Sequence, residues 1–168
     1  MAKKLVSGQY AQEVAVINPT LEGDQFFASV VFNVAEEGTV DVIVVAPVIK
    51  EISLTFQVKA GRDAMFTKFE GVIYEEGYPL ASANKLRSSP LTSEVVILLE
   101  PTVSNPGLQL FTWHLGFGDN IIGSEIEENV SFVLRNSTAY LFRVANLAPG
   151  SNWISFRFAW SEADIIPT

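Results

Sequence analysis

The sequence predicts an all-β protein, an antiparallel β-sandwich of the jelly-roll type with about eight to ten strands and no substantial helix. Short segments with apolar residues at alternate positions recur along the chain, separated by turns rich in Gly, Pro, Asn and Ser. Hydrophobic residues make up 48% of the chain, with 12 Phe and only 2 Met, a composition that suits pleated sheets. No repeat of solenoid or propeller period is present, which leaves a sandwich or a barrel.

The chain of 168 residues is long enough for one domain with a sizeable core. Residues 1–12 are polar and rich in small side chains, so we predict an N-terminal arm there. Residues 13–168 are predicted to form a single β-sandwich domain.

In the first third of the chain, residues 13–17 are predicted to form a short strand that ends at Asn18-Pro19. Residues 26–35 and 39–46 are apolar strand candidates joined by a three-residue link ending in Gly38. This spacing predicts a β-hairpin, with a positive φ at the last link residue.

In the middle of the chain, residues 52–58 alternate apolar and polar side chains without interruption, which predicts a half-buried strand. Residues 64–74 are predicted to form the next strand, with a mixed second face. Residues 75–90 have little periodicity and many turn formers, so we expect a long loop. Strands are expected again at residues 94–99 and 108–115, with prolines at 101 and 106 forcing a reversal between them.

Residues 129–160 read as three successive strands with short turns, which predicts an antiparallel meander. From Trp153 to Trp160 the alternation is clear. Trp153, Ser155, Arg157 and Ala159 share one face, while Ile154, Phe156, Phe158 and Trp160 share the other and are expected in the core.

Charge and cysteine content restrict the function. The formal net charge is -8, which argues against nucleic acid as a ligand because such binding depends on Lys and Arg at phosphates. The absence of cysteine excludes disulfides, thiol nucleophiles and cysteine zinc sites. The longest apolar run, residues 42–49, includes Pro47 and is far shorter than the ~20 residues needed to cross a bilayer, so no membrane span is expected.

No constellation of residues predicts catalysis. His114 is the only histidine, and no nucleophile motif accompanies it, so we predict no catalytic residue and no enzyme activity. The acidic pair Glu75-Glu76 and the acidic residues at 125, 127 and 128 lack the spacing of a calcium loop. They are interpreted as solvated charged surface, and neither a metal nor a cofactor is predicted. Tyr78, Trp113 and Phe117 could stack on sugars or could belong to the core or an interface.

From about Phe69 onward, an ordered set of short motifs resembles a family of tailed-bacteriophage virion proteins of the head decoration, or cement, type. The set consists of Glu70-Gly71, Asn84 with Arg87, Pro101 to Asn105 followed by Gly107, Gly116 with Gly118, residues 133–143, Ile154, and Trp160-Ser161-Glu162. Arg135 and Asn136 stand where a Lys-Pro pair is common in that family, and the loop 116–128 contains fewer glycines.

The resemblance implies a jelly roll that sits on the outer surface of a phage head and fastens adjacent major capsid proteins, after synthesis in the bacterial cytoplasm. It also implies self-association, with a homotrimer favoured and a homodimer possible. Loop position nominates the contact residues, which are Lys3, Lys4 and Tyr10 in the arm, Tyr78, Asn84 and Arg87 in the long loop, and Phe117 and Asp119. The alternative is a carbohydrate-binding jelly-roll module of a phage fibre or spike.

Overall fold

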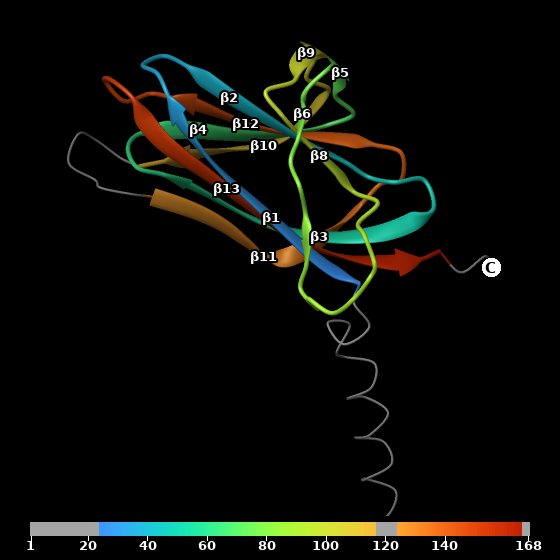
Figure 1. Ribbon diagram of the computed structural model, residues 1–168. Coiled ribbons are helices and arrows are strands. Elements are labelled where there is room, and N and C mark those ends of the chain that lie inside the picture. Colours follow the sequence, from blue (N-terminus) through green and yellow to red (C-terminus); the bar gives the residue numbers. More distant parts are fainter. Residues whose placement is uncertain (1–23, 117–123, 166–168) are drawn as a thin grey trace, which may run out of the picture.

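The computed structural model describes residues 24–116 and 124–165, and the side chains of all of these except residues 124–131. Two antiparallel sheets pack face to face (Figure 1). Sheet A contains, in spatial order, β11 (Ser124–Leu134), β3 (Lys50–Ala60), β13 (Asn152–Asp164), β1 (Gln25–Val34) and β7 (Ala83–Asn84). Sheet B contains β10 (Leu108–Leu115), β4 (Ala64–Glu70), β12 (Ala139–Asn146), β2 (Thr39–Val45), β8 (Val96–Leu99) and β6 (Tyr78–Pro79).

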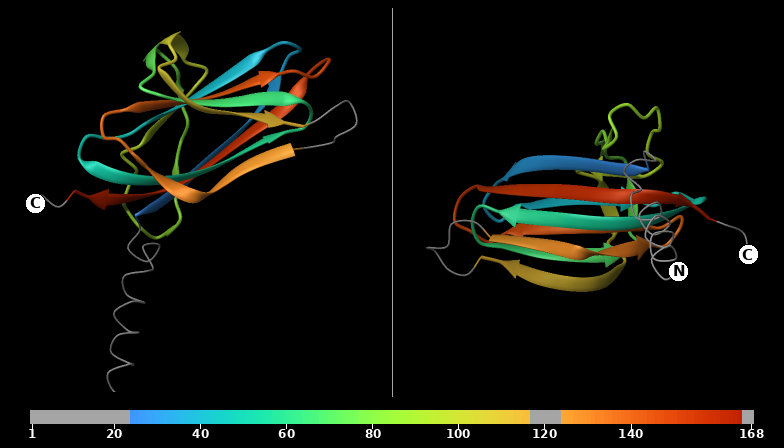
Figure 2. Two further views of the ribbon diagram at one scale, coloured as in Figure 1. Left: turned by 180° about the vertical axis from the view of Figure 1, so that it is seen from behind. Right: turned by 90° about the horizontal axis from the view of Figure 1, so that it is seen from below.

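The strand order is that of a jelly roll, which confirms the predicted fold class. Eight strands of seven residues or more form two four-stranded layers, β11-β3-β13-β1 and β10-β4-β12-β2. Along the chain these strands alternate between the layers except at β4 and β10, which are neighbours in sheet B. Figure 1 shows the two layers one above the other, with sheet B in the upper part, and the right-hand view of Figure 2 looks onto the face of sheet A.

Two predicted connections were wrong. β1 and β2 do not form a hairpin, because β1 pairs with β13 and β7 while β2 pairs with β12 and β8. Likewise β11, β12 and β13 are not a meander, since β12 lies in the opposite sheet. In each case a tight turn carries the chain across the sandwich. Apolar alternation places the strands' faces correctly in both arrangements, so it does not distinguish them.

The described residues contain thirteen strands, more than the eight to ten predicted, and no helix. The additional strands are β5 (Ile73–Glu75), β6, β7 and β9 (Thr102–Asn105), each two to four residues long, whereas β8 lies within the strand predicted at residues 94–99. Three of them lie wholly or partly in the predicted loop 75–90, where the sequence lacks alternation because pairing is too short to need a buried face. None of the described segments forms a helix that could span a membrane.

Phenylalanine rings fill the space between the sheets. Phe142 contacts Phe56 and Phe158 edge-on, with centroid separations of 5.1 and 5.0 Å, and Phe66 stacks on it from the neighbouring strand β4. Such offset and edge-on pairs are the favoured geometry of aromatic rings. The four residues predicted to point inward from the last strand, Ile154, Phe156, Phe158 and Trp160, are all buried.

β4 buries the face that the sequence pattern left mixed. Ala64, Phe66 and Lys68 point into the sandwich and are buried, while Met65 lies on the outer face with intermediate exposure. The Lys68 ammonium nitrogen lies 3.0 Å from the ring centroid of Phe132. Burial of a lysine among aromatic rings is stabilised by cation–π attraction, a contact that periodicity does not reveal.

A second, smaller apolar cluster lies on the outer face of sheet B. The two-stranded sheet of β5 and β9, here called the flap, packs there (Figure 1). Val72 and Tyr74, at the β5 side of the flap, and Val103 of β9 contact a patch that includes Ile43 and Leu141, both fully buried. The flap therefore covers part of sheet B.

Candidate functional site

The predicted contact residues divide into two groups. Lys3, Lys4, Tyr10, Phe117 and Asp119 lie outside the described residues, as do the arm 1–12 and the predicted strand 13–17. Tyr78, Asn84 and Arg87 are described and belong to one continuous segment, residues 76–95, here called the strap.

The strap connects the two sheets along one side of the sandwich. β6 adds to β8 at the edge of sheet B, and the Leu80 amide donates to the Ile97 carbonyl at 2.9 Å. β7 adds to β1 at the edge of sheet A, and the Lys85 amide donates to the Gln25 carbonyl at 2.8 Å. The strap thus caps both sheet edges, which would otherwise present unpaired backbone groups.

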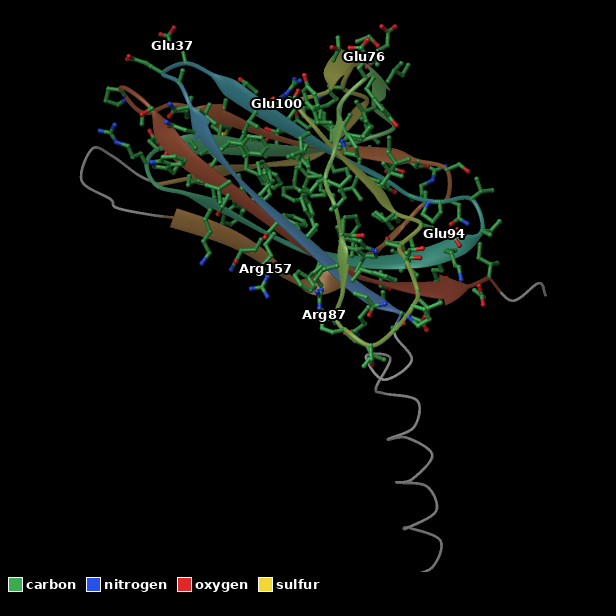
Figure 3. All side chains as sticks on the ribbon, viewed as in Figure 1. Glu37, Glu76, Arg87, Glu94, Glu100 and Arg157 are labelled. Carbon is green, nitrogen blue, oxygen red and sulfur yellow. The ribbon has the colours of Figure 1, made fainter. Side chains whose placement is uncertain are left out.

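The three predicted strap residues have different environments. Tyr78 is 70% exposed, and Arg87 is exposed on the lower side of the molecule in Figure 3. Asn84 instead has a structural role, because its side-chain oxygen accepts from the Leu86 amide at 2.9 Å and its side-chain nitrogen donates to the Leu91 carbonyl at 3.3 Å. Tyr78 and Arg87 are therefore available for contact, and Asn84 shapes the loop between them.

A buried carboxylate anchors the C-terminal end of the strap. Glu162 of β13 accepts from the Ser93 hydroxyl at 2.5 Å, from the Glu94 amide at 3.1 Å and from the Trp160 indole nitrogen at 3.1 Å. Hydrogen bonds to an ionised carboxylate are among the strongest in proteins. The strap is consequently fixed at both ends.

Three of the motifs that carry the family resemblance meet at one corner of the molecule, although they are far apart in sequence. The Gly71 amide donates to the Ala139 carbonyl at 2.9 Å, and Arg135 pairs with Glu70 at 3.2 Å. The Arg135 amide in turn donates to the Tyr140 hydroxyl at 2.9 Å. The carbonyl groups of Glu70 and Gly71 also face Gly107 closely. This corner joins β4, the flap and β12.

On the outer face of sheet B, Arg143 of β12 and Asp41 of β2 are register partners and form a bidentate ion pair. The Arg143 Nε and Nη2 atoms donate to the two Asp41 carboxylate oxygens at 2.8 and 2.7 Å. Hydrogen bonding to Asp41 raises the pKa of Arg143 above its ordinary value. The Arg143 guanidinium also lies 5.9 Å from the Phe69 ring centroid. The sequence analysis included Arg143 in the motif 133–143 but had no signal for its partner.

The residues considered for catalysis or metal binding do not form a cluster among the described side chains. His114 lies beside Asp63, with its Nε2 3.2 Å from the Asp63 carboxylate. Among the described residues no group of three or more His, Cys, Asp or Glu side chains is arranged to hold a metal ion. The side chains of Glu125, Glu127 and Glu128 are outside the described set.

The comparisons with known proteins leave the family open. No protein-family model and no curated protein matches the chain. It aligns with the crystal structure of PliG from Aeromonas hydrophila, a periplasmic lysozyme inhibitor of g-type lysozyme, at 15% identity and a TM-score of 0.31, covering 82% of this chain and 86% of that one. It also aligns with the structure of Desmodium yellow mottle tymovirus at 9% identity and a TM-score of 0.26, covering 84% and 90%. Likeness at these TM-scores carries no argument, so the fold assignment rests on the strand order alone.

Proposed function

We propose that this protein is a structural, non-enzymatic protein of a phage particle that decorates the outer surface of the head and fastens adjacent major capsid proteins. The observation that carries the proposal is the meeting of Glu70-Gly71, Gly107 and residues 135–140 at one corner. These segments meet because β4 lies between β10 and β12, with Glu70 the register partner of both Leu108 and Tyr140. Three motifs of the resemblance to decoration proteins therefore contribute to one structural corner of the sandwich, which supports the proposal.

The architecture suits a protein that acts by contact. A decoration protein needs a rigid scaffold whose exposed segments bury surface across neighbouring subunits. The strap supplies such a segment, because it is hydrogen-bonded to both sheets yet leaves Tyr78 and Arg87 exposed. Tyrosine and arginine are enriched where interfaces concentrate their binding energy. We place the capsid contact on the strap.

Self-association is placed on the opposite side of the sandwich. Among the described strands, β10 is terminal in sheet B and pairs only with β4. It contains no Lys, Arg, Asp or Glu, and Leu108 and Trp113 are 67% and 55% exposed. An apolar, uncharged edge strand is a template for pairing with another chain. We assign this edge to contacts between copies, with a homotrimer favoured by the resemblance and a homodimer as the alternative.

Binding to expanded heads tests the proposal. Purified protein is mixed with expanded heads that lack it, and the bound fraction and the heat resistance of the particles are measured together. Ligation of the expanded head stabilises it by about 2.7 kcal/mol when the free protein is at 100 times its Kd. The double variant Tyr78→Ala/Arg87→Glu is expected to bind at least tenfold more weakly.

Glu36→Gln is the matched control, since Glu36 is exposed in the turn that also contains Glu37, far from Arg87 in Figure 3. The control is expected to bind like the original protein. The decoration role is abandoned if the protein does not bind, or if bare heads withstand heat and chelation as well as decorated ones.

The alternative of a carbohydrate-binding fibre or spike module depends on the aromatic residues Tyr78, Trp113 and Phe117, of which only Tyr78 and Trp113 are among the described residues. Their strands β6 and β10 are the two opposite edges of sheet B. With four strands between them and a strand spacing of about 4.8 Å, the two side chains lie too far apart to form one stacking platform. This separation favours the decoration role as the leading proposal.

A further inference from the structure

No described segment covers the outer face of sheet A. The flap covers part of the corresponding face of sheet B, whereas Val31, Val133 and Trp153 on sheet A are 61%, 57% and 62% exposed. Within the described part of the chain this face is therefore open to solvent. Its composition can be read from the strand register.

Three central strands define a grid of side chains on this face. Along β13 the outward residues are Trp153, Ser155, Arg157 and Ala159. Their partners on β1 are Asn33, Val31, Ser29 and Phe27 in the same order, and those on β3 after Trp153 are Lys59, Gln57 and Thr55. Short hydroxyl and amide side chains thus lie between the Trp153 ring at one end of this grid and the Phe27 ring at the other.

Trp153 has an open ring because of its neighbours. On the β3 side it adjoins Gly61, whose amide donates to the Trp153 carbonyl at 2.9 Å and which has no side chain to cover the indole. On the β1 side its register partner is Asn33, an exposed amide. An exposed aromatic ring beside a hydrogen-bonding amide presents both an apolar plane and a polar group.

Arg157 supplies a positive charge at the centre of the face. It is exposed between Ser29 and Gln57, and no described carboxylate lies within ion-pair distance of its guanidinium. Arg157 and Trp153 are four residues apart on one strand, a separation of about 13 Å between their Cα atoms. A ligand that reaches both must be longer than a single sugar ring.

We propose that the outer face of sheet A binds an acidic oligosaccharide, one pyranose ring stacking on Trp153 and a uronate carboxylate pairing with Arg157. The guanidinium matches a carboxylate with two parallel hydrogen bonds. The hydroxyl and amide groups of Ser29, Asn33 and Ser155 bond the sugar hydroxyls between these points. This activity is additional to the decoration role and does not depend on it, because the capsid contact is assigned to the strap.

A second copy of the chain fits this face less well. Two copies packed about an axis through the centre of the face would oppose their Arg157 guanidinium groups, and opposed like charges destabilise a contact. Sheets that pack face to face interdigitate apolar side chains about 10 Å apart. Here the central row is Ser29, Arg157 and Gln57, all polar, and it continues to Glu127 of β11, the register partner of Gln57.

Titration calorimetry with defined oligosaccharides tests the proposal. The probes are hexasaccharides from alginate and from hyaluronan, which carry carboxylates, and cellohexaose, which carries none. The original protein is expected to bind the acidic probes more tightly than cellohexaose. Trp153→Ala is expected to weaken binding of the acidic probes at least tenfold. Arg157→Gln is expected to remove the preference for acidic probes.

Val48→Ala is the control, because Val48 is an exposed apolar side chain that lies between β2 and β3, outside the strands of sheet A. Its affinity for the probes is expected to stay within twofold of the original. Retained circular dichroism and melting temperature verify that each variant is folded. The proposal is overturned if the original protein binds none of the acidic probes, if Val48→Ala loses as much affinity as Trp153→Ala, or if Trp153→Ala changes the mass of the oligomer.

Discussion

Gly107 occupies a position that no other residue fits. Its φ is 84°, and a Cβ there would meet the carbonyl oxygen of Glu70 and lie 2.8 Å from the carbonyl carbon of Gly71. Gly71 also has a positive φ, 74°, but a Cβ there meets nothing within 4 Å. A substitution at Gly71 therefore introduces backbone strain alone, whereas a substitution at Gly107 introduces both backbone strain and steric overlap.

We predict that Gly107→Ala lowers the free energy of unfolding by about 3 kcal/mol, combining the left-handed backbone cost with overpacking. Gly71→Ala is expected to cost about 1 kcal/mol, the backbone term alone. Urea denaturation measures both. Equal losses for the two variants would contradict the close approach of the β9–β10 connection to the end of β4.

Tyr140 makes the free energy of unfolding depend on pH in the alkaline range. Burial raises the pKa of its phenol, against the opposing effect of the hydrogen bond from the Arg135 amide. The folded state thus holds the phenol proton more tightly than the unfolded chain does. The resulting stabilisation is present below the unfolded pKa of about 10 and is lost as the pH rises from there through the folded value.

Denaturation midpoints measured between pH 8 and pH 11 are accordingly expected to fall above about pH 10. Tyr140→Phe is expected to reduce that fall, and at pH 8 to cost about 1 kcal/mol through the loss of the acceptor for the Arg135 amide. An unchanged alkaline slope in the variant would show that another group is responsible. Tyr78→Phe, at an exposed site, is the control.

Alternation identified the buried face of the last strand but failed for single residues whose partners are distant in sequence. The burial of Lys68 could not be predicted from the sequence, because a lysine on a strand is ordinarily solvated. The Phe132 ring beside it explains its burial. Asp41 and Arg143 are likewise 102 residues apart. Pairings of this kind depend on the strand order, which local pattern does not contain.

The order of the strap depends on the Glu162 side chain. The Glu162 carboxylate accepts hydrogen bonds from Ser93, Glu94 and Trp160. A glutamine at this position keeps one acceptor oxygen but directs an NH2 group, itself a donor, toward these donors. We predict that Glu162→Gln lowers the free energy of unfolding by about 2 kcal/mol. The Glu94 and Val95 amides are expected to exchange with solvent much faster, while amides of β3 stay protected.

Asp164→Asn is the control for this measurement, because Asp164 is a nearby carboxylate whose side chain is 84% exposed. Exposed ion pairs contribute little, so its exchange pattern is expected to match the original. If both variants released the strap equally, net charge rather than the Glu162 hydrogen bonds would be the cause.

Elements were predicted better than their connections. The long strands were found because each buries one face, which imposes a period of two on the sequence. Tight turns such as residues 35–38 have the composition of hairpin turns and yet pass between sheets. The site shows the same limit. Trp153 and Arg157 were placed on one face by the pattern, but whether another element covers that face is a property of the folded molecule.

At the scale of the whole molecule, the two sides of the sandwich differ. One side is capped by the strap, which pairs with both sheets. At the other side β10 is a terminal strand, with Leu108 and Leu110 exposed. Natural sheets protect such edges with charge, proline or a cover. The sequence of β10 contains neither a charged Lys, Arg, Asp or Glu nor a proline. For this reason we assign self-association to β10.

We predict that Leu108→Lys/Leu110→Lys converts the oligomer to monomers, because two charges on the edge repel a neighbouring copy and cost desolvation. Sedimentation velocity across a concentration series measures the change. Leu147→Lys, at an exposed leucine between β12 and β13, is the control and is expected to keep the original mass. Both substitutions lie on the surface, so the folding of each protomer is expected to change by less than about 0.5 kcal/mol per site. A wild-type protein that sediments as a monomer at every concentration, or a Leu147→Lys variant that dissociates equally, would remove β10 from consideration as the self-association edge.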